Sequence, residues 1–119
     1  MIDIYSGAKY SLITSNGWCK HKDGGRPSGC EVYTAVSLDS MKSYCTNHPS
    51  CIGFTFQASD DYGFLYVSDD SCPSAFPYVS RDGWKVAETI DDLVAEETEE
   101  FVCYGKIIGK SILESQQYF

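Results

Sequence analysis

The stretch that decides the fold is YCTNHPSCIGFTF, residues 44–56. Cys45 ends a segment whose apolar residues recur at spacings of three and four, which is the period of a helix. After five intervening residues, Cys51 opens a segment with the alternation of a strand. The side chains expected on one face of this strand are Ile52, Phe54 and Phe56. This arrangement is typical of a disulfide that staples a helix to the strand after it.

Local signals mark both ends of the predicted helix. Ser37 is a favourable N-cap residue, and Asp39 lies in the first turn, where the helix dipole favours an acid. His48-Pro49 ends the helix, because proline disfavours α geometry in the residue before it. The apolar face of the helix consists of Leu38, Met41 and Cys45.

Length and charge limit the class of protein. The chain has 119 residues, which is one domain, and its hydrophobic content of 43% is enough for a packed core. The formal net charge of −8 argues against nucleic acid and anionic membrane surfaces, because clustered lysine and arginine bind both. No apolar run reaches the ~18 residues that a membrane helix needs. We therefore expect no nucleic-acid partner and no membrane insertion.

The six cysteines indicate disulfides rather than a metal site. Their number is even, and none belongs to the C-x-x-C pairs of a zinc ribbon. Disulfides in a small acidic domain imply an oxidising compartment, so we expect a secreted or cell-surface location. A signal peptide is not apparent, so we expect that it has been removed or that the chain is an excised domain. These observations leave the pairing of the cysteines open.

Alternating segments bounded by turns predict the rest of the sheet. We expect strands at residues 2–13, 52–56, 64–67, 84–88 and 101–108, and a short strand or an approach to the helix at residues 31–36. The residues from Asp60 to Gly63 predict a hairpin turn, and Thr89 is expected to cap a short second helix. The expected fold class is α+β, an antiparallel sheet with one main helix.

These segments resemble the PAN/Apple domain family. The residues that carry the resemblance are 45–56 with the helix before them, Trp18-Cys19 and 101–105. The resemblance spans roughly Tyr10 to Lys106. It implies a curved antiparallel β-sheet that cradles one main α-helix and is stapled by disulfides.

The resemblance also implies an activity and a domain organisation. Members of the family are non-catalytic modules that bind proteins or carbohydrates outside the cell. We therefore expect an adhesion or interaction module that forms a single domain over residues 1–110. Residues 111–119 form a C-terminal tail that is too apolar for a free end, so we expect it to dock on its own domain or on a neighbouring copy.

The disulfide pairing follows from the same resemblance. The expected bridges are Cys19–Cys103, Cys45–Cys51 and Cys30–Cys72. The first joins the first and last strands, the second joins the helix to the next strand, and the third is a departure from the family pattern. Another bridge common in the family would need cysteines in place of Met41 and Phe64. Because both are absent, we expect an apolar contact between these two side chains instead.

Histidines and cysteines raise two chemical alternatives, a zinc site and a catalytic site. The pattern Cys45-x-x-His48-x-x-Cys51, together with Cys19-x-His21, holds thiolate and imidazole groups of the kind that bind zinc. Even cysteine usage favours bridged cysteines and a solvated His48 instead. A catalytic nucleophile needs a nearby base, and both histidines lie in polar loops outside any known catalytic motif. We expect no metal, no cofactor and no enzymatic activity.

Acidic pairs offer oxygen ligands for Ca²⁺. The pairs are Asp60-Asp61, Asp69-Asp70, Asp91-Asp92, Glu96-Glu97 and Glu99-Glu100. Their spacing matches no known calcium loop. A solvated, acidic surface is the simpler interpretation.

Aromatic side chains near turns form the most suggestive candidate site, because flat rings beside polar groups serve both sugar and protein recognition. The candidate ligand-binding residues are Tyr62, Tyr66, Arg81, Asp82, Trp84 and Lys85. We expect Tyr62 to be exposed and Trp84 to lie mainly in the core. The leading hypothesis is a module that recognises an extracellular protein or glycan. The rival hypothesis is a structural subunit of an extracellular assembly or filament that self-associates through its tail and aromatic surface.

Overall fold

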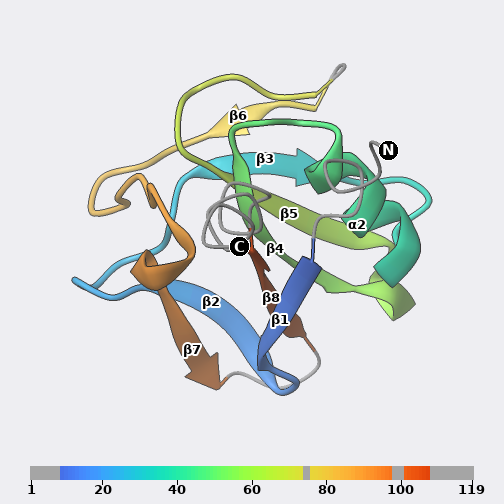
Figure 1. The fold of residues 1–119 in the computed structure, drawn as a ribbon, viewed down its shortest axis with the longest axis horizontal. Helices are drawn as coiled ribbons and strands as arrows, with labels where there is room; N and C mark the ends of the chain where they lie inside the picture. The colour runs from blue at the N-terminus through green and yellow to red at the C-terminus, as the bar shows by residue number, and fades with distance from the viewer. Residues whose placement is uncertain (1–8, 74–75, 98–100, 108–119) are drawn as a thin grey trace, which may run out of the picture.

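An antiparallel six-stranded sheet, a two-stranded sheet and one α-helix form the fold (Figure 1). The computed structural model describes residues 9–73, 76–97 and 101–107. In spatial order the larger sheet consists of β1 (Lys9–Thr14), β8 (Val102–Ile107), β4 (Cys51–Gln57), β5 (Tyr62–Val67), β3 (Gly29–Val32) and β6 (Tyr78–Val79). The smaller sheet pairs β2 (Gly17–His21) with β7 (Leu93–Glu97). The remaining elements are α2 (Leu38–Thr46) and the short 3-10 helices η1 (Ala58–Asp60) and η2 (Ile90–Asp92).

The helix α2 begins where its capping residues predict. The Ser37 hydroxyl accepts a hydrogen bond from the Ser40 backbone N–H at 3.1 Å, and the Ser40 hydroxyl oxygen accepts one from the Ser37 N–H at 2.9 Å. This reciprocal pair satisfies donors that a helix start would otherwise leave free. The helix ends at Thr46, shortly before Pro49, and buries Met41 and Cys45. The predicted helix is confirmed.

The two faces of the larger sheet pack against different layers. On β5, Leu65 and Val67 belong to the buried cluster under α2, which includes Met41. The alternate residues Phe64 and Tyr66 belong to a second cluster. That cluster also contains Cys19 of β2 and Leu93 of β7, so the smaller sheet covers the face opposite the helix. The expected α+β class, an antiparallel sheet with one main helix, is confirmed for the described residues.

Three disulfides hold these layers together, with the predicted pairing. The bridges are Cys19–Cys103, Cys30–Cys72 and Cys45–Cys51. The first joins β2 to β8, the second joins β3 to the loop after β5, and the third joins α2 to β4. The Cys45–Cys51 bridge therefore spans a short loop, whereas the Cys19–Cys103 bridge spans most of the domain.

The predicted contact between Met41 and Phe64 is wrong. Phe64 lies in the cluster away from the helix, whereas Met41 lies over Gly63. A Cβ atom built on Gly63 would come within 2.7 Å of Met41 Cε and 2.8 Å of its Sδ. Because side chains alternate along a strand, an error of one residue in the facing position moves the predicted partner to the opposite face.

A bulge causes a similar error at the start of β4. The pairing between β4 and β5 shifts between Cys51 and Gly53. As a result Ile52 joins the cluster away from the helix, while Phe54 joins the cluster under it. The two side chains were predicted on one face, and the extra residue of the bulge separates them.

Other predicted boundaries need correction. Residues 84–88 form no strand, only an isolated bridge between Pro27 and Lys85. Thr89 precedes η2 but makes no side-chain cap, and the chain then enters β7, which was not predicted. β5 starts at Tyr62, inside the expected hairpin turn. Within the expected first and last strands, residues 2–8 and 108 lie outside the described residues, as does the tail at 111–119.

Candidate binding surface

Two tryptophans and an arginine from three separate segments meet on the surface. Trp18 comes from β2, Arg26 from the β2–β3 loop, and Trp84 from the segment after β6. The guanidinium carbon of Arg26 lies 4.1 Å from the centroid of the Trp18 ring and 4.9 Å from that of Trp84. The larger set around this contact, which we call the aromatic–arginine surface, comprises Trp18, Arg26, Glu31, Tyr33, Tyr62, Arg81, Trp84 and Phe101.

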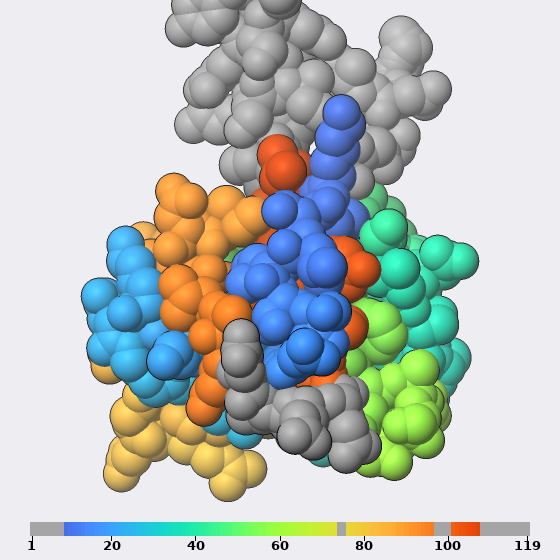
Figure 2. All heavy atoms as spheres, turned by 90° about the horizontal axis from the view of Figure 1, so that it is seen from below, coloured from blue at the N-terminus to red at the C-terminus, as the bar shows by residue number. Residues whose placement is uncertain are grey.

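Backbone hydrogen bonds hold Arg26 beside Trp84. The Lys85 N–H donates to the Arg26 carbonyl at 2.9 Å, and the Ser28 N–H donates to the Lys85 carbonyl at 3.1 Å. Gly25 makes this approach possible, because its φ is +82° and an added Cβ would lie 2.1 Å from the Gly83 carbonyl oxygen. Figure 2 shows the two segments, light blue and gold, meeting at one edge of the molecule.

Both faces of the Trp18 ring are covered. The Phe101 ring stacks on Trp18 with centroids 4.2 Å apart and an interplanar angle of 28°. A phenyl ring and a guanidinium group that each lie about 4 Å from one centroid cannot share the same side of it. Arg26 and Phe101 therefore occupy opposite faces of the indole.

Two guanidinium groups lie over the ring of the half-buried Trp84. The Arg81 guanidinium carbon lies 5.8 Å from its ring centroid, in addition to Arg26 at 4.9 Å. Phe64 meets the ring edge-on at 6.1 Å. Guanidinium groups over an indole are stabilised by the negative ring face.

The guanidinium of Arg26 has no acidic partner within the described residues. The ion pair among those residues is Lys22–Asp92, and the only other approach is the 3.9 Å contact between the His21 Nδ1 atom and the Asp23 carboxylate. In the same part of the chain, no hydrogen bond from the Arg26 side chain is present. Arg26 is half-buried, so the rings hold its N–H donors in place, and no described residue accepts a hydrogen bond from them.

A carboxylate and two tyrosines extend the surface on the other side of Trp18. The Tyr33 and Tyr62 hydroxyls both donate hydrogen bonds to the Glu31 carboxylate, and the two rings lie 5.6 Å apart. Tyr62 also meets the Trp18 ring edge-on at 6.1 Å. Burial, and then the nearby Glu31 charge, raise the pKa of Tyr62 to about 12. Tyr33 is 54% exposed, so this end of the surface is open to solvent.

The predicted site residues divide into two groups. Arg81, Asp82 and Lys85 are exposed around Trp84, and Tyr62 and Trp84 are each half-buried rather than fully exposed or fully buried. Tyr66 does not fit the prediction. It is 1% exposed, and its hydroxyl donates to the Cys19 carbonyl at 3.4 Å, so it belongs to the core and not to a binding surface.

Sequence reasoning missed five members of the surface. Arg26 lies in a glycine-rich loop that carries no periodic signal, and Glu31 and Tyr33 were assigned to a possible short strand. Trp18 and Phe101 were noted only as neighbours of the cysteines that follow them. The Cys19–Cys103 bridge does explain their contact, because it brings the strands that follow both aromatic residues together.

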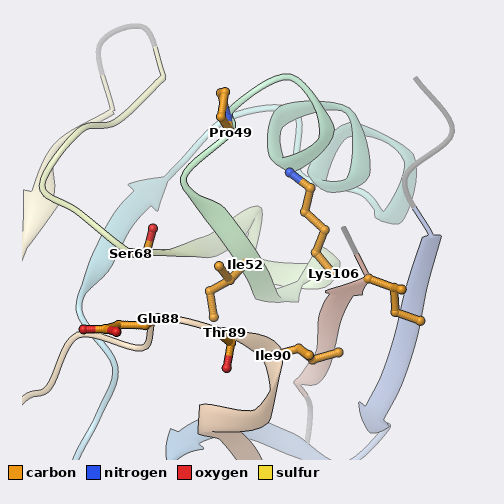
Figure 3. A pocket seen from close by; sticks show the side chains of 8 residues that line it. Pro49, Ile52, Ser68, Glu88, Thr89, Ile90 and Lys106 are labelled. Carbon is orange, nitrogen blue, oxygen red and sulfur yellow. The ribbon is translucent and has the colours of Figure 1, made fainter. Parts of the chain in front are cut away.

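A separate pocket of about 310 Å³ opens near the end of α2 (Figure 3). Its lining residues are Pro49, Ile52, Ser68, Glu88, Thr89, Ile90, Lys106 and Ile107. The Lys106 ammonium group donates to the Cys45 carbonyl at 2.7 Å and to the His48 carbonyl at 3.3 Å. Burial lowers its pKa. The ammonium group thus binds the carbonyl groups at the C-terminal end of the helix, where a cation is favourable.

The histidines and cysteines of the zinc hypothesis have other partners. All six cysteines are in disulfides, so no thiolate remains to bind a metal. His48 Nε2 lies 3.0 Å from the Ser71 carbonyl oxygen, and His21 Nδ1 accepts the Asp23 N–H at 3.1 Å. In the described part of the chain, no three histidine, cysteine or acidic residues gather as a metal site would require.

The acidic pair at Asp69-Asp70 has a local role. Asp69 accepts hydrogen bonds from the Ser50 hydroxyl at 2.6 Å and from the Ser71 hydroxyl at 2.6 Å. These hydrogen bonds hold the pKa of its carboxyl down, at about 2. Asp69 thereby links the turn before β4 to the loop that contains Cys72.

Comparisons with protein-family models, with curated proteins and with solved structures give no match. None of the helices in residues 9–73, 76–97 and 101–107 has the length and apolar character needed to cross a membrane.

Proposed function

We propose that the chain is a non-catalytic, extracellular recognition module of the PAN/Apple type, which binds a protein or a glycan through the aromatic–arginine surface. One observation carries this proposal. The Arg26 guanidinium is held between Trp18 and Trp84 and has no acidic partner among the described residues.

The composition of the surface supports recognition. Tryptophan, tyrosine and arginine dominate the residues that contribute most to binding energy at protein interfaces. Here these types form one continuous set of contacts from Tyr33 through Tyr62 and Trp18 to Trp84. Clusters of partly exposed aromatic side chains on small domains are typical of interaction sites.

The disulfides support an extracellular location and the PAN/Apple type. Disulfides persist in oxidising compartments. The helix staple Cys45–Cys51 and the bridge Cys19–Cys103 match the pairing that the resemblance implies. Cys30–Cys72 is the departure from the family pattern, and Met41 over Gly63 replaces the bridge that the family commonly has.

The contacts of the candidate nucleophiles and bases support a non-catalytic role. No free thiol is present, because every cysteine is oxidised. The Nδ1 atom of His21 accepts a backbone N–H, and the Nε2 atom of His48 contacts Ser71. The His48 Nε2 atom also lies 3.1 Å from the Ser71 hydroxyl oxygen, but that hydroxyl donates its hydrogen bond to Asp69 rather than to the imidazole.

The proposal is tested by screening the oxidised protein against a glycan array and a panel of immobilised extracellular proteins. We expect at least one ligand that binds the native protein and is lost in the exposed double variant Tyr33→Ser/Arg81→Ser. The matched control is Leu12→Ser/Lys42→Ser, which also removes one apolar and one positive side chain, away from the surface. The proposal fails if no ligand is found, or if the ligand binds both variants equally.

A second candidate function is a structural subunit of an extracellular assembly. The observation that favours it lies at the β1 edge of the larger sheet, where Leu12 is 52% exposed and Ile107 of the neighbouring strand β8 is 36% exposed. Exposed edge strands pair readily with other chains. Light scattering over a dilution series, with and without residues 111–119, distinguishes the two functions. A monomer at all concentrations, unaffected by removal of the tail, contradicts the structural role.

A further inference from the structure

We infer that Arg26 is an anchor for a carboxylate on an acidic segment of a protein partner. This inference rests on the proposed recognition function and names the chemistry of its ligand. It follows from three features of the aromatic–arginine surface. The faces of the Trp18 ring are covered, the Arg26 donors have no acceptor among the described residues, and cations gather around Trp84.

The ring faces that a neutral sugar would need are already occupied. Arg26 and Phe101 cover the two faces of Trp18, and Arg26 and Arg81 lie over Trp84. A sugar ring that stacks on an indole needs a bare face. Trp18 therefore provides no platform for a neutral glycan, and at Trp84 a sugar ring would compete with two guanidinium groups for the indole.

The uncommitted group is the donor edge of the guanidinium. The N–H bonds of arginine lie in the plane of the guanidinium group. Its central carbon lies 4.1 Å from the Trp18 centroid and 4.9 Å from that of Trp84, so the donors that point away from the two rings are left for a ligand. A carboxylate matches two parallel donors of this fork, and charge-assisted pairs of this kind are the strong ones.

The rings also prepare the arginine for binding. A free arginine side chain loses rotamer entropy when it binds, and this loss weakens the complex. The Trp18, Trp84 and Phe64 rings already restrict Arg26, whose guanidinium carbon lies 6.0 Å from the Phe64 centroid. The Arg26 side chain therefore loses less conformational entropy when it binds a carboxylate.

The local charge differs from the charge of the whole chain. The net charge is −8 with nine lysine and arginine residues, yet three of these nine, Arg26, Arg81 and Lys85, lie around Trp84 or on the segment that holds it. Glu31 and Asp82 add negative charge to the same surface, but among the described residues neither forms an ion pair with these cations.

This distribution favours a short acidic segment over an extended polyanion. Charges farther apart than the Debye length, about 8–10 Å in physiological salt, interact weakly. A single aspartate or glutamate at Arg26 therefore experiences mainly the local cations. A long polyuronate or sulfated glycan would extend over the remaining acidic surface and be repelled by it.

The test is an NMR titration of the oxidised, full-length protein with three probes. They are acetylated and amidated tetraglutamate, the corresponding tetraglutamine, and trigalacturonate as a carboxylated glycan. The resonances followed are the Arg26 Nε–H and the indole N–H groups of Trp18 and Trp84. We expect tetraglutamate to shift all three resonances, tetraglutamine to shift none, and trigalacturonate to bind more weakly than tetraglutamate.

Variants assign the effect to Arg26. We expect Arg26→Gln to weaken tetraglutamate binding at least about tenfold, since it removes a charge-assisted pair, and Arg26→Lys to weaken it less. Lys42→Gln on α2 makes the same change in net charge and is expected to leave binding unchanged. Near-ultraviolet circular dichroism checks that each variant is folded, and the wild-type Arg26 Nε–H titration is informative without any variant.

Each other outcome overturns the inference. Failure of tetraglutamate to bind, or equal binding by Arg26→Gln and Lys42→Gln, excludes a carboxylate anchor. Arg26-dependent binding of trigalacturonate that is tighter than that of tetraglutamate would indicate a carboxylated glycan as the ligand. A screened partner that requires Tyr33 and Arg81 but tolerates Arg26→Gln would retain the recognition function while overturning the inference about Arg26.

Discussion

The Lys106 ammonium nitrogen lies 2.7 Å from the carbonyl oxygen of Cys45, to which it donates a hydrogen bond. Lys106 belongs to β8, and Cys45 belongs to the last turn of α2, which itself contains no basic residue. A lysine 61 positions later in the chain thus supplies the cation that the helix end favours. The contact also secures the cysteine that forms the helix staple.

Replacement of Lys106 by methionine is expected to destabilise the protein. Methionine keeps much of the side-chain volume but removes the ammonium donor, while the backbone N–H groups of His48 and Cys51 still reach the two carbonyls. Hydrogen bonds that involve a charged group contribute about 1.5–3 kcal/mol. Urea unfolding measures the change, with the exposed Lys9→Met of β1 as the control for loss of one charge. Equal stability of Lys106→Met and the control would show that the contact contributes nothing.

The three disulfides are expected to differ in their effect on stability. The sequence separations of the bridged cysteines are 84 for Cys19–Cys103 and 6 for Cys45–Cys51. By chain entropy, loss of the long bridge costs about 4.5 kcal/mol and loss of the short one about 2 kcal/mol. Double Cys→Ala variants of each bridge, unfolded by urea in parallel, measure both values. A larger loss for Cys45–Cys51 would contradict the ranking.

Met41 and Gly63 mark a position where another disulfide can be introduced. The Met41 thioether reaches the place that a Cβ on Gly63 would occupy, whereas Phe64 faces the other layer. We expect Met41→Cys/Gly63→Cys to form a fourth bridge and Met41→Cys/Phe64→Cys to retain two free thiols. Thiol titration under denaturing conditions counts them. Free thiols in the first variant, or a bridge in the second, would show that the facing residue is misassigned.

The protein is expected to lose stability in alkali. Burial raises the pKa of Tyr66 well above 10.0, and the pKa of Tyr62 rises to about 12. Above pH 10.0 the unfolded chain releases these protons while the folded protein keeps them. The stabilising contribution is therefore complete below that pH and is lost as the pH rises toward 12 and beyond. The lowered pKa of Lys106 acts in the opposite sense, so a matched variant is needed.

Tyr66→Phe provides that comparison. It removes the titrating hydroxyl and keeps the ring in the core, so its stability should fall less steeply than that of the wild type above pH 10.0. Urea unfolding at a series of alkaline pH values measures both slopes. Parallel curves for the two proteins would mean that Tyr66 does not contribute to the loss.

The sequence predicts those parts of the fold that local chemistry determines. Ser37 and Pro49 mark the helix because capping and proline act within a few residues. The resemblance supplied two disulfide pairs, and the two remaining cysteines formed the third. The side that a strand residue faces was less predictable. The bulge between Cys51 and Gly53 places Ile52 and Phe54 in different layers, and Gly63 rather than Phe64 faces Met41.

The candidate site could be predicted only in part. Trp84 and its charged neighbours are close in sequence, so composition alone identified them. Arg26 joins them through backbone hydrogen bonds between two loops, and Trp18 joins them from β2, which pairs with a strand that had been predicted as a helix. Such contacts depend on tertiary structure, and no periodic pattern in the sequence records them.

The most direct test of the recognition surface is the Arg26 Nε–H resonance of the wild-type protein, followed as tetraglutamate is added. The Trp18 and Trp84 rings at 4.1 and 4.9 Å should shift this resonance upfield in the free protein, and the peptide should move it further in a saturable way. A resonance at the position of a free arginine that does not respond to the peptide would contradict both the stacked geometry and the binding role.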